Sequence, residues 1–165
     1  MKTFIPQRLV NLILFLSLFG VFAGCNASTS SHLKEYQKKS LILSPKEKII
    51  VYIASSDTEQ KRGLSKIKST DFSKNEGMLF PAKRMFIRQF WMPETFFNLD
   101  IFFLNQDYFV IDIQRNLQHF PQREPKKDVP ISRAVFSQHV LELRSDSEIS
   151  KKITIGMKLD FKDLN

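Results

Sequence analysis

Short apolar runs separated by polar and turn-forming residues make up most of the chain after residue 45. These runs are rich in β-branched and aromatic side chains, which fit the half-buried surface of a sheet. They predict strands at residues 48–53 (KIIVYI), 77–80 (GMLF), 99–104 (LDIFFL), 108–113 (YFVIDI), 140–143 (VLEL) and 155–161 (IGMKLDF). The residues 105–107 (NQD) between two of these runs predict a hairpin.

Two polar segments predict short helices. Ser56 and Glu59 have the spacing of a capping box, in which each side chain accepts a hydrogen bond from the backbone N–H of the other residue, and this helix is expected to end near Gly63. The second helix is expected at residues 145–152, after a loop at 117–130 that contains three prolines. Many short strands with two short helices predict an α+β fold, mostly β, with a small compact barrel-like sheet that is mixed or antiparallel.

The first 24 residues have the pattern of a signal peptide. Lys2 and Arg8 supply a positive start, residues 9–23 form an apolar run, and small residues close it. A membrane-spanning helix needs about 20 consecutive apolar residues, whereas this run is shorter and is interrupted by Asn, Ser and Gly. We therefore expect residues 1–24 to direct export and to be removed.

Cys25, the only cysteine of the chain, follows this signal directly. Residues 22–25 (FAGC) resemble the lipobox of bacterial lipoproteins, with Phe22 where Leu is usual. The resemblance implies that the Cys25 thiol is acylated and anchors the protein in a membrane, because two or more acyl chains hold stably. Asn26 rather than Asp follows the cysteine, which by resemblance to the sorting rules of enterobacterial lipoproteins favours the outer membrane. We expect an envelope lipoprotein that faces the periplasm or the exterior; the alternative is an ordinary signal with an incidental cysteine.

The rest of the chain divides into a tether and one domain. Residues 25–45 are polar, serine-rich and basic, and they predict a flexible tether behind the lipid-bearing cysteine. Residues 46–165 are long enough for a single globular domain. The formal net charge of the chain is +8, which favours contact with anionic lipid or another acidic envelope component. A solvated basic face is the simpler alternative, and export argues against nucleic acid as a partner.

Several motifs of this domain resemble the domain-of-unknown-function 192 family, small bacterial and archaeal domains that often carry secretion signals. The similar segments lie in order at 58–64 (TEQKRGL), 76–80 (EGMLF), 90–95 (FWMPET), 99–103 (LDIFF), 140–143 (VLEL) and 155–159 (IGMKL). Ser65 and Lys66 stand where the family usually has Met and Arg, and Glu94 stands where it has Asn. The resemblance implies a compact β-rich fold with short helices, and it supplies no accepted activity.

A set of aromatic, charged and hydroxyl side chains within these motifs forms the candidate ligand-binding site: Arg62, Trp91, Thr95 and Asp100. Arg62 could clamp a carboxylate or phosphate, and Trp91 could form an aromatic platform for a ligand. Asp100 is a carboxylate inside an apolar run, where burial disfavours charge unless a cation or backbone N–H groups meet it. Structural alternatives stay open: Asp100 paired with a basic residue such as Arg62, Trp91 packed in a core or rim, and Arg62 as a helix-end cation.

No motif for catalysis or cofactor binding accompanies these residues. The sequence has no glycine-rich phosphate loop and no nucleophile elbow. The single cysteine excludes disulfides, cysteine-ligated zinc and thiol catalysis in the domain. His119 and His139 lack a third ligand at a recognisable spacing, so neither metal nor cofactor is expected. We therefore expect a non-enzymatic binding or accessory domain of the envelope; the alternative is an envelope hydrolase or transferase that uses Asp100 or Glu94 with Arg62.

Overall fold

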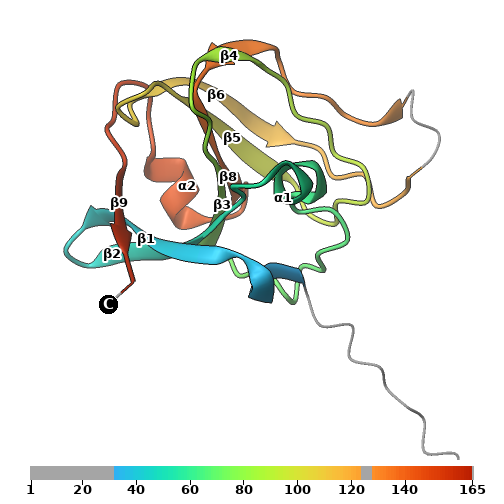
Figure 1. Ribbon diagram of the computed structural model, residues 1–165. Coiled ribbons are helices and arrows are strands. Elements are labelled where there is room, and N and C mark those ends of the chain that lie inside the picture. The colour runs from blue at the N-terminus through green and yellow to red at the C-terminus, as the bar shows by residue number, and fades with distance from the viewer. Residues whose placement is uncertain (1–31, 124–127, 165) are drawn as a thin grey trace, which may run out of the picture.

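A twisted mixed sheet forms the centre of the described structure (Figure 1). The computed structural model describes residues 32–123 and 128–164. The sheet has seven strands in the order β6-β5-β8-β3-β2-β1-β9. Their bounds are β1 (Gln37–Ser44), β2 (Glu47–Ile53), β3 (Glu76–Phe80), β5 (Leu99–Leu104), β6 (Val110–Leu117), β8 (His139–Arg144) and β9 (Asp160–Asp163). Strands β2 and β3 pair in parallel, and the other neighbours in this sheet pair antiparallel.

Short helical segments and a two-stranded ribbon complete the described structure. The helical segments are the 3-10 helix η1 (His32–Glu35) and the α-helices α1 (Asp57–Arg62) and α2 (Glu148–Lys152). The ribbon pairs β4 (Phe86–Arg88) with β7 (Val135–Ser137) in antiparallel orientation. Among the described residues, none of the helices has the length and apolarity needed to cross a membrane.

Local hydrogen bonds fix both ends of α1, as the sequence predicts. The Ser56 side chain accepts a hydrogen bond from the Glu59 amide at 3.2 Å, and the Glu59 carboxylate accepts one from the Ser56 amide at 2.8 Å. Gly63 ends the helix with a φ of 47°, a conformation that glycine adopts without strain. The Gln60 side chain donates to the Pro81 carbonyl at 2.8 Å, so α1 is docked beside the end of β3.

Side chains of the central strands alternate between two buried faces of the sheet. Strand β5 is buried along its whole length, and successive residues of a strand point to opposite faces. One core cluster contains Leu99, Ile101 and Phe103, together with loop residues such as Leu64, Phe72 and Met92. The other contains Phe102, Leu104 and Leu141, together with Ile149 of α2 and Ile153 after it. A polar residue in β5 or β8 is therefore buried whichever face it takes.

The predicted fold class and hairpin are confirmed, and the barrel-like closure is not. The described chain is mostly β with two short α-helices. Strands β5 and β6 form the expected hairpin. In its turn, the Asn105 side chain accepts hydrogen bonds from the Asp107 and Phe109 amides. The sheet does not close into a barrel, because its edge strands β6 and β9 are not paired with each other. A bond of 2.9 Å from the Val110 amide to the Met157 carbonyl holds the two edges near each other.

The tether predicted at residues 25–45 is wrong for its second half. Strand β1 occupies most of that half and pairs with β2 on one side and β9 on the other. Leu41 of β1 is fully buried, and Leu33 of η1 and Tyr36 directly after it enter the core. The lysines that precede Leu41 suggested a polar linker, but Lys38 and Lys39 lie in the paired strand itself, where Lys38 is exposed and Lys39 is half-buried. The signal at 1–24, Cys25 and the tether up to residue 31 lie outside the described residues.

The predicted last strand is also displaced. Residues 155–161 were expected to be extended, whereas β9 begins only at Asp160. Gly156, with a φ of 87°, lies in a turn before it. The turn brings the Gly156 amide to the Val110 carbonyl at 2.8 Å, so the apolar residues of this segment pack against the start of β6 before they reach the edge of the sheet.

Candidate ligand-binding site

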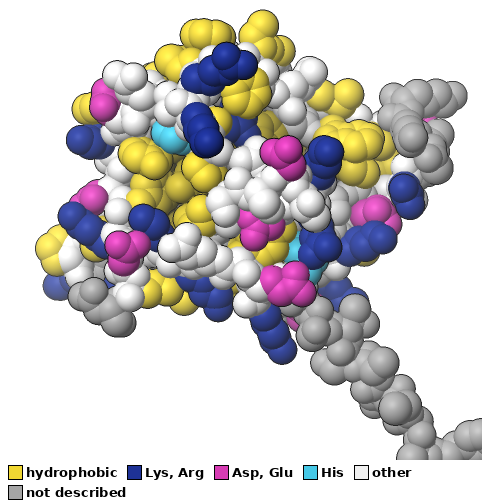
Figure 2. Space-filling view, viewed as in Figure 1, with side chains coloured by type: hydrophobic (Ala, Val, Ile, Leu, Met, Phe, Trp, Pro, Cys, Tyr) yellow, Lys and Arg dark blue, Asp and Glu magenta, His cyan; other side chains and the backbone are white. Residues whose placement is uncertain are grey.

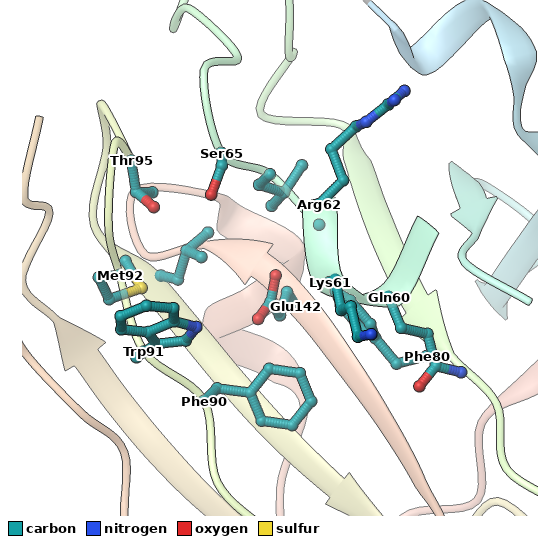
Figure 3. A pocket seen from close by; sticks show the side chains of 13 residues that line it. Gln60, Lys61, Arg62, Ser65, Phe80, Phe90, Trp91, Met92, Thr95 and Glu142 are labelled. Carbon is teal, nitrogen blue, oxygen red and sulfur yellow. The ribbon is translucent and has the colours of Figure 1, made fainter. Parts of the chain in front are cut away.

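Three of the four candidate residues lie around one pocket, and the fourth does not (Figure 3). Arg62, Trp91 and Thr95 line a cavity of about 50 Å³, which we call the inner pocket. Helix α1, the end of β3, the segment 90–95 and β8 supply its walls. The lining residues are Gln60, Lys61, Arg62, Gly63, Leu64, Ser65, Phe80, Phe90, Trp91, Met92, Thr95, Leu99 and Glu142.

Aromatic rings form much of the wall of the inner pocket. Phe80 and Phe90 meet edge to face with ring centroids 5.1 Å apart, a favourable geometry for two aromatic rings. Trp91, the only tryptophan of the chain, is 54% exposed and stands at the mouth. Its indole N–H has no hydrogen-bond partner in residues 32–123 and 128–164, so this donor is available to a ligand.

The carboxyl group of Glu142 lies deep in the inner pocket. Glu142 is in β8, opposite Met78 of β3 and Ile101 of β5, and the residue is only 5% exposed. Figure 3 shows its carboxylate among Trp91, Phe90 and Lys61. Within the described part of the chain, no hydrogen bond or ion pair reaches it, and its oxygen atoms are not completely shielded from the cavity. Burial raises the pKa of Glu142 to about 8, and the charge of Arg88 opposes that rise.

Arg88 is a buried cation close enough to influence Glu142, but its hydrogen bonds are to other groups. Its guanidinium donates to the carbonyl oxygens of Phe80 and Gln138 at 3.1 and 2.9 Å. It also lies over the rings of Phe86 and Phe90, 5.1 and 5.4 Å from their centroids. Burial lowers the pKa of Arg88 to about 10. Arg88 therefore influences Glu142 through its charge, without forming an ion pair with it.

A wider, basic groove continues from the mouth of the inner pocket. This outer groove, of about 380 Å³, is lined by His32, Lys61, Arg62, Ser65, Lys66, Trp91, Pro93, Glu94 and Arg123. Glu94 is its one acidic residue and pairs with Lys66 at 3.5 Å. Arg62 pairs with Glu35 at 3.5 Å, and Figure 3 shows its side chain extending away from Glu142. The outer groove thus presents more positive than negative charge.

Two residues of the outer groove have an unusual backbone conformation. Lys66 and Glu94 have φ angles of 64° and 54°, in the left-handed region that costs a non-glycine residue about 1 kcal/mol or more. A bond of 2.8 Å from the Lys66 amide to the Glu94 carbonyl joins them. Such strain is often found at functional sites; Tyr108 and Asn116, which do not line the groove, also have positive φ angles.

The hydroxyl groups of Ser65 and Thr95 both donate to one carbonyl at the mouth of the pocket. Ser65 donates to the Pro93 carbonyl at 2.9 Å, and Thr95 donates to it at 3.4 Å. Thr95 is further fixed by backbone bonds of 3.1 Å in each direction with Phe120. Because their protons are engaged, both hydroxyl oxygens present lone pairs rather than donors to a ligand.

Asp100 is separated from the inner pocket because it points to the opposite face of the sheet. Its neighbour Leu99 lines the pocket, while the Asp100 carboxylate accepts hydrogen bonds from Arg115 at 2.7 Å, Ser150 at 2.6 Å and the Asn116 amide at 2.8 Å. The structural interpretation of Asp100 as an ion-paired acid is therefore correct, but its partner is Arg115 rather than Arg62. A separate open depression adjoins this pair.

The histidines of the domain take part in structural contacts. His119 Nδ1 lies 2.7 Å from the Asn98 side-chain oxygen, and His139 accepts from the Ala82 amide at 3.2 Å while stacking on Tyr108. The described residues contain no group of three His, Cys, Asp or Glu side chains that could hold a metal ion.

Sequence reasoning missed Glu142 and His32 as residues of this region. Glu142 carried the same signal as Asp100, an acid inside an apolar strand (VLEL beside LDIFFL). His32 was assigned to the tether, whereas it lines the outer groove and its Nε2 lies 3.1 Å from the Gly63 carbonyl. Burial lowers the pKa of His32.

Residues 41–161 match the family described as uncharacterized ACR, the domain of unknown function 192 (DUF192). The chain belongs to the DUF192 family. The match begins within β1 and ends within β9, so it spans the whole sheet apart from the ends of those two strands. No curated protein matches the chain.

Two solved structures resemble this DUF192 protein. One, provisionally named a transcription regulator, is from Sinorhizobium meliloti 1021; it is 22% identical, with a TM-score of 0.61 over 76% of this chain and 95% of its own. The other, a protein of unknown function from Novosphingobium aromaticivorans DSM 12444, is 25% identical, with a TM-score of 0.55 over 74% of this chain and 83% of its own. These likenesses support the fold.

Proposed function

We propose that this DUF192 protein is a lipid-anchored binding domain of the bacterial envelope that takes part of a small ligand into its inner pocket. The observation that carries the proposal is the buried carboxyl group of Glu142, which faces that pocket without a partner in the described chain. A small concave site with apolar walls and a few convergent polar groups is the usual form of a ligand pocket.

The physical cost of this arrangement supports a functional role. Desolvation of the Glu142 carboxylate makes its ionised form costly in the folded state, and the strained pair Lys66 and Glu94 adds a further cost. An apolar residue at position 142 would pack between Met78 and Ile101 without these penalties. Destabilising features are typical of sites that recognise a ligand.

The expected signal at residues 1–24 and the expected acylation of Cys25 place the domain in the envelope under this proposal. Asn26 favours the outer membrane. The excess of Lys and Arg would strengthen attraction to anionic lipid, although Figure 2 shows Lys and Arg dispersed over one face with Asp and Glu among them. No nucleic-acid partner is proposed, and the ligand is expected to be a component of the envelope.

The pocket chemistry favours binding over catalysis. Ser65 and Thr95 are the hydroxyl groups of the inner pocket, and each donates to the Pro93 carbonyl rather than to a general base. Glu94 and Arg62 share the outer groove, but Asp100, the other acid of the hydrolase or transferase alternative, is held on the opposite face by three donors. No observation specifically favours that alternative.

Fluorescence of Trp91, the only tryptophan, provides a direct test. The full chain, purified in a non-ionic detergent, is titrated with the low-molecular-weight fraction of a bacterial envelope extract. We expect a saturable change that Arg62→Ala and Thr95→Val weaken and that Glu148→Gln, an exposed change on α2, leaves intact. The proposal would be contradicted if the wild type showed no saturable change, or if both pocket variants showed a change as large as that of the wild type.

A further inference from the structure

We propose that the ligand is a small zwitterion: a primary ammonium group enters the inner pocket and faces Glu142, while an acidic group, carboxylate or phosphate, stays in the outer groove. This inference deepens the binding function proposed above and rests on it. It follows from the opposite chemistry of two adjoining spaces that share Lys61, Arg62, Ser65 and Trp91 as lining residues.

The inner pocket offers acceptors to a donor-rich group. The Glu142 carboxylate has no partner in the described chain, and the Ser65 and Thr95 hydroxyl oxygens retain lone pairs because their protons go to Pro93. An ammonium group has three donors and no acceptor, which matches this set. The faces of aromatic rings attract cations as well, and Trp91 and Phe90 both line the cavity.

The size of the inner pocket limits what enters it. A cavity of about 50 Å³ holds only a few non-hydrogen atoms, since one water needs roughly 10–15 Å³ on this scale. An ammonium group with one or two carbon atoms fits this limit. The larger remainder of the ligand must then lie in the outer groove, which has about 380 Å³.

The outer groove selects the opposite charge. Lys61, Arg62, Lys66 and Arg123 line it. Glu94 pairs with Lys66 and Glu35 pairs with Arg62, which leaves an excess of two positive charges. Arginine binds carboxylate and phosphate through paired N–H donors. Once Glu142 is ionised, it repels an anion from the inner pocket, and the outer groove repels a cation. The two spaces therefore fix the orientation of a zwitterion.

Binding of the ammonium group should release a proton from the protein. The pKa of free Glu142 is raised to about 8, so the carboxyl group is mostly protonated at neutral pH, whereas the ammonium group binds its ionised form. Arg88 from β4 is the charged group that acts on the pKa of Glu142. Lys61 and Arg62 from α1 line the same pocket, with the Arg62 side chain extending away from Glu142 (Figure 3), and the paired residues of β3 and β5, Met78 and Ile101, are uncharged. Affinity should therefore rise about tenfold per pH unit below the pKa of Glu142.

A series of ω-amino acids, from glycine to 6-aminohexanoate, tests the inference on the full chain at about pH 8. Each probe has two controls of equal chain length, the alkylamine and the alkanoate, and binding is followed by Trp91 fluorescence and calorimetry. One chain length is expected to bind about tenfold more tightly than its alkylamine, and the alkanoates are expected not to bind. Equal binding of an alkanoate and its amino acid would overturn the proposal.

Variants assign the two ends of the ligand. Glu142→Gln should weaken binding of the ω-amino acid by about tenfold or more. Arg62→Ala should reduce the affinity for the ω-amino acid to that for the alkylamine. Glu148→Gln is the matched control. Glu142→Gln is expected to be more stable than the wild type near pH 8, so a loss of binding in this variant would not result from unfolding; urea denaturation of the variant checks this. Unchanged binding in Glu142→Gln would overturn the proposal.

Competition separates this inference from the proposed function. If the envelope extract gives a saturable signal and no ω-amino acid competes with it, the binding function stands and the zwitterion assignment is wrong. If neither the extract nor any amino acid binds, both are wrong. If an amino acid competes and its binding releases about one proton at neutral pH, both are supported.

Discussion

Glu142 keeps a proton in the folded chain at pH values where the same carboxyl group would be ionised in the unfolded chain. Its usual pKa of 4.5 is raised to about 8, and desolvation by burial is the main cause. Between these two values folding takes up a proton, so the free energy of unfolding decreases as the pH rises. At the residue scale, the Glu142 carboxyl group that provides the acceptor of the pocket therefore also lowers the free energy of unfolding.

Replacing Glu142 with Gln should stabilise the protein in a pH-dependent way. The amide has nearly the same shape and no proton to lose, so the variant should gain about 2–4 kcal/mol in free energy of unfolding near pH 8. The gain should shrink as the pH falls and vanish near 4.5. Urea denaturation at a series of pH values measures this difference.

Glu148→Gln is the control for that pH profile. Glu148 is exposed, and its hydrogen bond to Lys151 lowers its pKa below the usual 4.5, so any pH-dependent effect of its removal lies on the acid side of the profile. A Glu142→Gln profile that runs parallel to the wild type from 4.5 to about 8 would show that Glu142 is not protonated in the folded state.

At the residue scale, the sequence indicated that an acid inside an apolar strand contributes to the site. It did not indicate to which face of the sheet each acid points. Asp100 and Glu142 are both acids in apolar strands. Strand alternation alone implies that Asp100 points away from the face of Leu99. Which face carries the pocket depends on how α1 and the segment 90–95 pack on the sheet. No local sequence pattern fixes that packing, so the sequence could not decide between the two acids.

At the element scale, the segments with local signals were predictable. The capping box of α1, its end at Gly63 and the β5–β6 hairpin each depend on residues close in sequence. Strand β1 lacks such a signal, because its polar residues obscure Leu41 and its stability comes from pairing with β2 and β9. The ribbon pairs β4 with β7, two segments that lie far apart in the chain. No local sequence pattern predicts this pairing.

Strand β1 should be necessary for folding, contrary to a domain that starts at residue 46. Removal of β1 would expose the edge of β2 and the part of the core that Leu41 fills. Strand β9 would also lose its pairing partner. A chain of residues 46–165 is expected to lose cooperative unfolding, whereas a chain of residues 26–165 is expected to retain it. Circular dichroism during thermal unfolding compares the two; equal midpoints would contradict the role of β1.

At the scale of the whole molecule, the pocket is a consequence of sheet order. Strand β8 lies between β5 and β3, which places Glu142 on an interior strand of the sheet. Helix α1 and the segment 90–95 then cover that position from opposite sides of the cavity. The fold class followed from strand propensity and strand number, but the strand order required knowledge of long-range pairing. Three of the four candidate residues nevertheless converge on the pocket.

Lipid attachment at Cys25 is the whole-molecule property that the sequence predicts most specifically. Cells that express the full chain and receive a tagged fatty acid should incorporate the tag into the wild type. Cys25→Ser should incorporate none, because the acyl acceptor is the thiol and this is the only cysteine of the chain. Immunoblotting confirms equal expression of both proteins. An unlabelled wild type, or an equally labelled variant, would contradict the lipid anchor.

The titration of the Glu142 carboxyl carbon tests the central claim most directly. The full chain, labelled with ¹³C at glutamate carboxyl groups and assigned with Glu142→Gln, is followed by NMR across the pH range without ligand. A buried carboxyl group without a partner should titrate with a midpoint of about 8. A midpoint near the usual 4.5 would show that Glu142 is solvated or paired, and the account of the pocket would be wrong.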